Sequence, residues 1–365
     1  MPEIRCEDCG CLFPENYLIH CCENCGGYFD FADLPEFDTG AYTPELPGIW
    51  KYRSSFSLRN PELVVTLGEG NTPFIWDDPT THEIGFKLES LNPTGSYKDR
   101  GSAVLVSQLL ARNVFSSVED SSGNAGASFA AYCARGGIAA RVYVPEQAAG
   151  PKRRQIEEYG AELVSVPGSR SQAAKAVIEA VENGDVYGSH AFLPFGIPGI
   201  ATIAYELAEQ TEGRIGTVIA PAGHGALLLG IMRGFAALVK CGILDSEPYY
   251  VGVQAENCSP LSLAYRYGLE KMADVFEGNT MAEGVRVSKP VRAKAILKHL
   301  SAARGEIITI PEEEILPACS HLAKKGVYAE PTSALTWAAL NHMNMEIPRP
   351  IILIISGNGL KYYPI

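Results

Sequence analysis

The sequence has no apolar run that approaches the roughly 20 residues of a membrane-spanning helix. Its first residues, Met1 to Cys6, lack the apolar stretch of a secretory signal peptide. Positive charge is also scarce: 30 lysines and arginines stand against 42 aspartates and glutamates, and the net charge is -12. This charge balance repels the phosphates of nucleic acids and of anionic lipids. We therefore expect a cytoplasmic protein that binds neither nucleic acid nor membrane.

Cysteine is rare after residue 25. The four later cysteines are scattered, and we expect them to be small buried hydrophobes; they are Cys133, Cys241, Cys258 and Cys319. Disulfides are not expected in a cytoplasmic protein.

The first 25 residues, in contrast, hold two knuckles, Cys6-x2-Cys9 and Cys22-x2-Cys25, each followed by a glycine. Four thiolates at this spacing are typical of a structural zinc site, which has no open position for water. Cys11 and Cys21 are spare, and either could replace one of the four ligands. The alternative is a ribbon that folds without metal, although so short a segment has little core of its own.

Internal repeats and low-complexity tracts are absent. At 365 residues, with 46% hydrophobic residues, the chain is long enough for two domains and an appendage. We place the zinc ribbon at 1–35 and a proline-containing linker at 36–47.

From residue 84 onward, short β-branched runs alternate with longer stretches of helical periodicity. We predict strands at 85–88, 117–120, 141–145, 162–166, 217–220, 250–254 and 351–355. We predict helices at 102–112, 125–135, 151–159, 171–182, 198–210 and 225–240. Short apolar strands separated by helices indicate an α/β fold with parallel sheets covered on both faces. In such folds ligands bind beyond the carboxyl ends of the strands.

Lys98 lies just before a predicted helix, in the segment 92–101. An amine on a first helical turn is well placed to form a Schiff base with a carbonyl cofactor. Ser96 and Asp99 have the spacing of a capping box, which would fix the start of the helix and so the position of the lysine. An exposed first-turn lysine without a special role is the alternative for this residue alone.

Three loops carry groups suited to the same ligand. After strand 117–120, hydroxyls, an amide and N–H groups at a helix start could hold a carboxylate. After strand 217–220, the glycine-rich segment 221–226 could wrap its N–H groups around a phosphate. After the last strand, Ser356 could meet a ring nitrogen. The alternative for each loop, taken alone, is an ordinary turn.

Taken together, six segments resemble the threonine synthase family of fold type II pyridoxal-phosphate enzymes. They are 69–73, 92–101, 121–128, 223–227, 330–334 and 356–361, in the order that this family has. Some members of the family also carry an amino-terminal ribbon. The resemblance implies two lobes: a large one from 48–101 and 197–365, and a small mobile one from 102–196, with the cofactor between them. It also implies a homodimer.

The resemblance assigns roles to particular residues. Lys98 would hold the cofactor covalently and, once displaced, would act as the catalytic acid and base. The other cofactor-binding residues would be Asn124, at the 3′-oxygen, then Gly223, His224, Gly225, Ala226 and Leu227, at the phosphate, and Ser356, at the pyridine nitrogen. The substrate carboxylate would be bound by Ser121, Ser122, Gly123, Asn124 and Ala125.

The sequence departs from the family before the predicted helix 198–210. The family usually has Asn-Pro-x-Arg there, which holds the phosphate of the substrate, whereas this chain has Leu193 and Gly196 at the asparagine and arginine positions. Losing such a cation costs about 2–5 kcal/mol of binding. His190, His224 or Arg100 could compensate. Tyr97 is a smaller departure, because the family usually has phenylalanine.

Three functions follow from these observations. The first is a lyase of threonine-synthase type, which converts O-phosphohomoserine and water to threonine and phosphate. The second is β-elimination or β-replacement on serine, threonine, phosphoserine or a related amino acid, as in ammonia-lyases and cysteate or cysteine synthases, and the missing arginine favours it. The third is a catalytically silent binding or regulatory protein, which the intact lysine motif disfavours.

Overall fold

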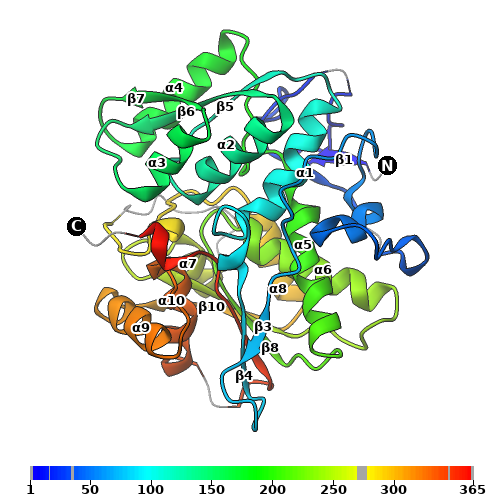
Figure 1. Ribbon diagram of the computed structural model, residues 1–365, viewed down its shortest axis with the longest axis vertical. Helices are drawn as coiled ribbons and strands as arrows, with labels where there is room; N and C mark the ends of the chain where they lie inside the picture. The colour runs from blue at the N-terminus through cyan, green and yellow to red at the C-terminus, as the bar shows by residue number, and fades with distance from the viewer. Residues whose placement is uncertain (1–2, 16, 34–36, 269–277, 344–345, 363–365) are drawn as a thin grey trace. The chain divides into compact units, whose positions relative to one another are not determined.

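The structure is a computed structural model that describes residues 3–15, 17–33, 37–268, 278–343 and 346–362 (Figure 1). The chain divides into two compact units. One comprises Met1–Gly70, Lys98–Gly199 and Tyr363–Ile365, and the other comprises Asn71–Tyr97 and Ile200–Tyr362. The predicted functional lobes have other boundaries and remain a prediction. None of the helices in the described ranges is long and apolar enough to cross a bilayer.

The first unit contains a three-stranded parallel sheet. Its strands, in spatial order, are β5 (Ser116–Glu119), β6 (Ala139–Pro145) and β7 (Glu162–Val166). Its helices are α1 (Lys98–Leu110), α2 (Asn124–Gly136), α3 (Pro151–Glu158) and α4 (Arg170–Glu182). Val118 of β5 packs in one core with Val177 of α4. Because successive side chains of a strand point to opposite faces, Glu119 points away from that core.

The same unit contains the amino-terminal ribbon. Strands β1 (Ile4–Cys6) and β2 (Phe29–Phe31) pair antiparallel. Cys6, Cys22 and Phe29 form a small buried cluster, with Phe13 and Ile19 packed against it. Because this core is small, other interactions must contribute most of the stability of the ribbon.

The second unit is built on a six-stranded sheet. Its strands, in spatial order, are β10 (Gly305–Ile310), β9 (Tyr249–Ala255), β8 (Thr217–Pro221), β11 (Ile351–Ile354), β4 (Ile84–Lys87) and β3 (Phe74–Trp76). All neighbours are parallel except β3, which pairs antiparallel with β4. Its helices are α6 (Ala226–Lys240), α7 (Pro260–Tyr267), α8 (Ala293–Ala302), α9 (Glu312–Lys324) and α10 (Pro331–Ala338). Helix α5 (Ile197–Gln210) begins in the first unit and continues into the second.

Short 3-10 turns connect these elements. They are η1 (Thr39–Ala41), η2 (Gly48–Phe56), η3 (Glu89–Leu91), η4 (Pro194–Gly196), η5 (Glu283–Val285), η6 (Ala339–Asn341) and η7 (Gly359–Lys361).

The predicted α/β class is confirmed, and strand 162–166 has the expected bounds. The predicted capping box is wrong. Helix α1 begins at Lys98, and the Ser96 hydroxyl is buried with no hydrogen-bond partner in the described part of the chain. Instead, the backbone of Ser96 forms an antiparallel bridge with Gly357. Tertiary pairing, not a local cap, fixes the chain here.

A buried ion pair joins the edge of the large sheet to α5. Lys87 Nζ lies 2.6 Å from Glu206 Oε2, and both side chains are at most 1% exposed. Lys87 Nζ also donates to Thr72 O at 2.8 Å and to Gln210 Oε1 at 2.9 Å. Full satisfaction of the ammonium explains how a lysine is tolerated in this core.

Replacing this lysine should therefore destabilise the protein strongly. We expect Lys87→Met to lower the free energy of unfolding by about 3–5 kcal/mol, because it leaves the Glu206 carboxylate buried without its counter-charge. Urea unfolding would measure the loss. The double variant Lys87→Met/Glu206→Leu should recover most of it. Arg154→Met breaks an exposed pair with Glu158 and should change stability by less than about 1 kcal/mol.

Candidate active site and candidate metal site

Lys98, the predicted cofactor lysine, is the first residue of α1 and is partly exposed. Hydrogen bonds to helix α2, in the same unit, hold the first turn of α1. The Ser128 hydroxyl of α2 donates to Asp99 Oδ1 at 2.6 Å and lies 2.8 Å from Ser102 Oγ. Asp99, which follows Lys98 directly, is fully buried. Helices α1 and α2 are thus joined at the position of the lysine.

The predicted carboxylate loop also lies in the first unit, between β5 and α2. Gly123 precedes the first residue of α2, Asn124, and Gly123 N donates to Ser121 Oγ at 3.3 Å. A side chain at Gly126 would place its Cβ 1.8 Å from Ser121 O, so only glycine permits this turn. The N-terminal N–H groups of α2 therefore sit beside serine hydroxyls, an arrangement suited to an anion.

A carboxyl–imidazole pair, which the sequence analysis did not identify, lies in the same unit. Glu119, the last residue of β5, is fully buried, and its Oε1 lies 2.7 Å from His190 Nδ1. Burial raises the pKa of Glu119 to about 8, against the opposing charges of Lys98 and Arg170. Burial and the charge of Lys98 lower the pKa of His190 well below its usual range. The sequence signal was an acidic pair, Glu119-Asp120, at the end of the predicted strand 117–120.

The glycine-rich loop lies in the second unit, between β8 and α6. Gly225 has φ +100°, and no side chain of the described residues caps the N-terminus of α6 behind it. A Cβ at Gly223 would lie 2.5 Å from Gly284 O. Arg292 N donates to His224 O at 3.3 Å and helps to hold the loop. Helix N–H groups without a side-chain cap, in a loop where Gly223 has no room for a side chain, fit a phosphate group.

Ser356 follows β11 in the second unit and is almost fully buried. Its hydroxyl lies 3.0 Å from Ser333 Oγ of α10. Its carbonyl accepts from Tyr97 N at 3.0 Å. The residue just before the lysine is therefore hydrogen-bonded to the backbone of the predicted ring-nitrogen residue.

The segment that departs from the family is closely packed against α1. Leu193 is buried, and a Cβ at Gly196 would lie 3.1 Å from Gly101 O and 3.2 Å from Gly101 Cα. A Cβ at Gly199 would lie 2.1 Å from Arg100 O. A side chain at position 196 would therefore require the backbone of Gly101 to shift by a few tenths of an ångström. Arg100, one of the suggested substitutes, is fully buried.

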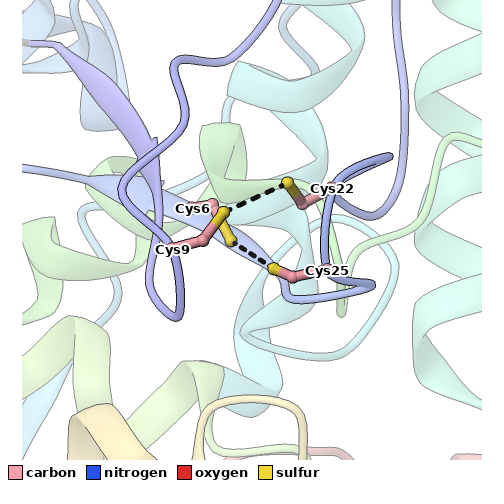
Figure 2. A group of neighbouring side chains, drawn as sticks. All are labelled: Cys6, Cys9, Cys22 and Cys25. Carbon is pink, nitrogen blue, oxygen red and sulfur yellow. Dashed lines mark hydrogen bonds between the residues drawn. The ribbon is translucent and has the colours of Figure 1, made fainter.

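The four knuckle cysteines lie together, as the spacing predicts. The Sγ atoms of Cys6, Cys9, Cys22 and Cys25 are within 4.8 Å of one another (Figure 2). Cys6 Sγ and Cys25 Sγ are 3.5 Å apart, and Cys9 Sγ and Cys22 Sγ are 3.6 Å apart. Thiolates at about 2.3 Å from a tetrahedral zinc would be about 3.8 Å apart, so the group fits such an ion. Cys11 and Cys21 are not part of this group.

Comparison with known proteins gives the same family as the motifs. The family model for pyridoxal-phosphate dependent enzymes matches residues 65–357. The threonine synthase of Methanocaldococcus jannaschii is 32% identical over 98% of this chain and 92% of its own length. The chain belongs to the threonine synthase family of pyridoxal-phosphate-dependent enzymes. A second member, the threonine synthase of Methanosarcina acetivorans, is 30% identical over 99% of this chain and 92% of its own length.

Solved structures support the fold of this family member. A threonine deaminase from T.th. has a TM-score of 0.66 at 27% identity and covers 77% of this chain and 89% of its own. Maize serine racemase has a TM-score of 0.69 at 22% identity and covers 79% of this chain and 88% of its own. At 22% identity, the similarity to maize serine racemase is evidence for the fold alone.

The described residues fit the cofactor of the family. Lys98, Asn124 and the 121–125 loop lie in the first unit, and the 223–227 loop and Ser356 lie in the second. A loop in which Gly223 has no room for a side chain, with helix N–H groups behind it, would suit the phosphate of the cofactor, and the buried Ser356 hydroxyl would suit a neutral ring nitrogen.

Proposed function

We propose that this enzyme is a lyase of threonine-synthase type, which converts O-phosphohomoserine and water to threonine and phosphate. The observation that carries the proposal is a similarity to threonine synthases that spans nearly the whole chain and includes the lysine segment. Such a reaction removes phosphate from Cγ of the substrate and adds water at Cβ. It needs an electron sink at Cα and a base that works on successive carbons.

Pyridoxal phosphate, when bound, supplies the electron sink. Lys98 is the covalent attachment point and, as a free amine, takes the proton from Cα and returns protons further along the substrate. Its attachment to the fixed first turn of α1 gives the amine a defined reach. The family motif assigns the phosphate of the cofactor to Gly223 through Leu227, and its 3′-oxygen to Asn124.

Ser356 has a specific chemical consequence in this role. If Ser356 meets the ring nitrogen of the cofactor, its neutral hydroxyl would not keep that nitrogen protonated, as a carboxylate would. The cofactor would then supply a weaker electron sink, which would favour elimination and addition over transamination. The hydrogen bond of Ser356 to Ser333 holds the hydroxyl in place. Ser122 to Ala125 would bind the carboxylate of the substrate through the N-terminus of α2.

A second enzymatic function keeps the cofactor and changes the substrate. It is β-elimination or β-replacement on serine, threonine, phosphoserine or a similar amino acid. Gly196 favours it, because the family usually has the phosphate-binding arginine at this position and a side chain there would press on the backbone of Gly101. Assembly as a homodimer and a cytoplasmic location remain predictions of the family resemblance and the composition.

Replacing the lysine tests both enzymatic functions together. The purified protein should show a visible absorbance band that borohydride bleaches, and Lys98→Ala should lack the band and lose activity by at least about 1,000-fold. Lys324→Ala is the matched control, because Lys324 is exposed at the end of α9 and its loss should leave the band in place. A wild-type protein without the band would exclude both functions.

Substrate assays separate the two functions. We expect O-phosphohomoserine to yield equal amounts of phosphate and threonine, measured over time with the purified enzyme. Serine, threonine and phosphoserine, with and without a thiol, are the comparison substrates. Keto acid or a thiol adduct from these, together with no phosphate from O-phosphohomoserine, would establish the second function and reject the first.

We also propose that the cysteines of the ribbon bind one structural zinc. Purified protein should contain one zinc per chain by elemental analysis. Cys22→Ser should lose it and should lower the unfolding temperature, because the cluster around Cys22 is small and metal binding supplies folding free energy. Cys241→Ser, at an exposed cysteine outside the ribbon, should retain the metal. Retention of full zinc by both variants would contradict the assignment.

A further inference from the structure

We propose that Ser333 is a positioning residue that directs the hydroxyl hydrogen of Ser356 away from α10, so that Ser356 donates it to the ring of the cofactor. The inference rests on the proposed function, which assigns Ser356 to the ring nitrogen. It adds the direction of that hydrogen bond and the residue that determines it. Both are open until the partners of the hydroxyl are known, because a serine hydroxyl can donate or accept.

The hydroxyl of Ser333 contacts three groups. Ser333 lies in the first turn of α10 and is fully buried. Gly357 N donates to its Oγ at 2.8 Å. Ser356 Oγ lies 3.0 Å from this oxygen, and Gly357 O lies 3.1 Å from it. Because a hydroxyl has a single hydrogen, Ser333 gives it either to Ser356 or to the carbonyl of Gly357.

The carbonyl of Gly357 already has a donor. Glu330 N, at the N-cap of α10, donates to it at 3.1 Å. The Ser356 hydroxyl has Ser333 Oγ as its only hydrogen-bond partner in the part of the chain that the structure describes. When Ser333 donates to Ser356, both oxygens have a donor, and the hydrogen of Ser356 is left for a ligand. This order leaves no buried acceptor unsatisfied.

The opposite order requires a positively charged ligand. If Ser333 donated to Gly357 O, Ser356 would have to donate to Ser333, and only its lone pairs would face the cofactor. A ring nitrogen could then bond to Ser356 only when protonated. Within the described residues, neither serine hydroxyl is hydrogen-bonded to a carboxylate that would stabilise such a charge. The order in which Ser356 donates therefore fits a neutral nitrogen, which can only accept.

Backbone hydrogen bonds hold this group of residues in place. Tyr97 N donates to Ser356 O at 3.0 Å, and the backbone of Ser96 pairs with that of Gly357. The side-chain donations run in one direction, from Gly357 N to Ser333 Oγ and on to Ser356 Oγ. Hydrogen bonds in such a chain polarise and strengthen one another. Ser333 thus makes Ser356 a stronger donor as well as an oriented one.

The test is the ¹⁵N resonance of the ring nitrogen in the full-length holoenzyme, loaded with pyridoxal phosphate that is labelled at that atom. The resonance distinguishes a protonated nitrogen from a neutral one, and a hydrogen-bonded neutral nitrogen from a free one. The variants are Ser333→Ala and Ser356→Ala. Thr336→Val is the matched control, because it removes another buried hydroxyl of α10, which bonds Ser333 O within the helix.

We expect the wild type to show a neutral, hydrogen-bonded ring nitrogen. In Ser333→Ala the resonance should move toward that of a neutral nitrogen without a hydrogen bond. The cofactor should also bind about 3- to 10-fold more weakly, as expected for a weakened or lost hydrogen bond. Ser356→Ala should shift the resonance at least as far in the same direction. Thr336→Val should give the wild-type resonance.

A protonated ring nitrogen in the wild type would overturn the inference without any variant, because Ser356 would then be the acceptor. An unchanged resonance in either serine variant would also overturn it, so the test stays decisive if one of them does not fold. These readings need bound cofactor but no turnover. Failure to form threonine from O-phosphohomoserine would therefore reject the proposed function and leave the inference standing, whereas a missing absorbance band would reject both.

Discussion

Hydrogen bonds on either side of Lys98 are the constraint on which the chemistry depends. Before the lysine, Tyr97 N bonds to Ser356 O at the end of β11. After it, Asp99 accepts from Ser128 of α2. The chain passes from one compact unit to the other between Tyr97 and Lys98. Lys98 thus lies on a short backbone segment whose neighbouring residues are hydrogen-bonded on both sides, and its position does not rest on local helix capping.

A different kind of constraint, close packing of one backbone segment against another, acts where the sequence departs from the family. Gly196 and Gly199 lie against Gly101 and Arg100 of α1, and a Cβ at either position would meet main-chain atoms. Main chain of a helix cannot move aside as a flexible side chain can. At position 196, where the family usually has arginine, any side chain would therefore require the backbone of Gly101 to shift.

Features that depend on residues close together in the sequence could be predicted from it. Strands and helices followed from periodicity, the thiol group followed from the spacing of Cys6, Cys9, Cys22 and Cys25, and the lysine segment identified the family. Features that depend on distant residues were missed or wrong. The Ser96 backbone pairs with Gly357 rather than forming the predicted cap, and nothing near Glu119 in the sequence points to His190, 71 residues away. Strand β10 and helices α7 to α10 were outside the predicted set, and β3 runs antiparallel within an otherwise parallel sheet.

The aromatic contacts of the ribbon have a consequence for how this protein is divided. Phe13 lies against Phe195, His20 lies against Tyr187 and Phe192, and the Arg59 guanidinium donates to Glu15 O at 2.7 Å. Removing the ribbon would take away Phe13 and His20. The rings of Tyr187, Phe192 and Phe195, which they contact, would then be exposed to solvent. The amino-terminal ribbon is therefore part of the packing of the first unit. Shortened forms of the enzyme would be prone to self-association through the aromatic side chains that the ribbon covers.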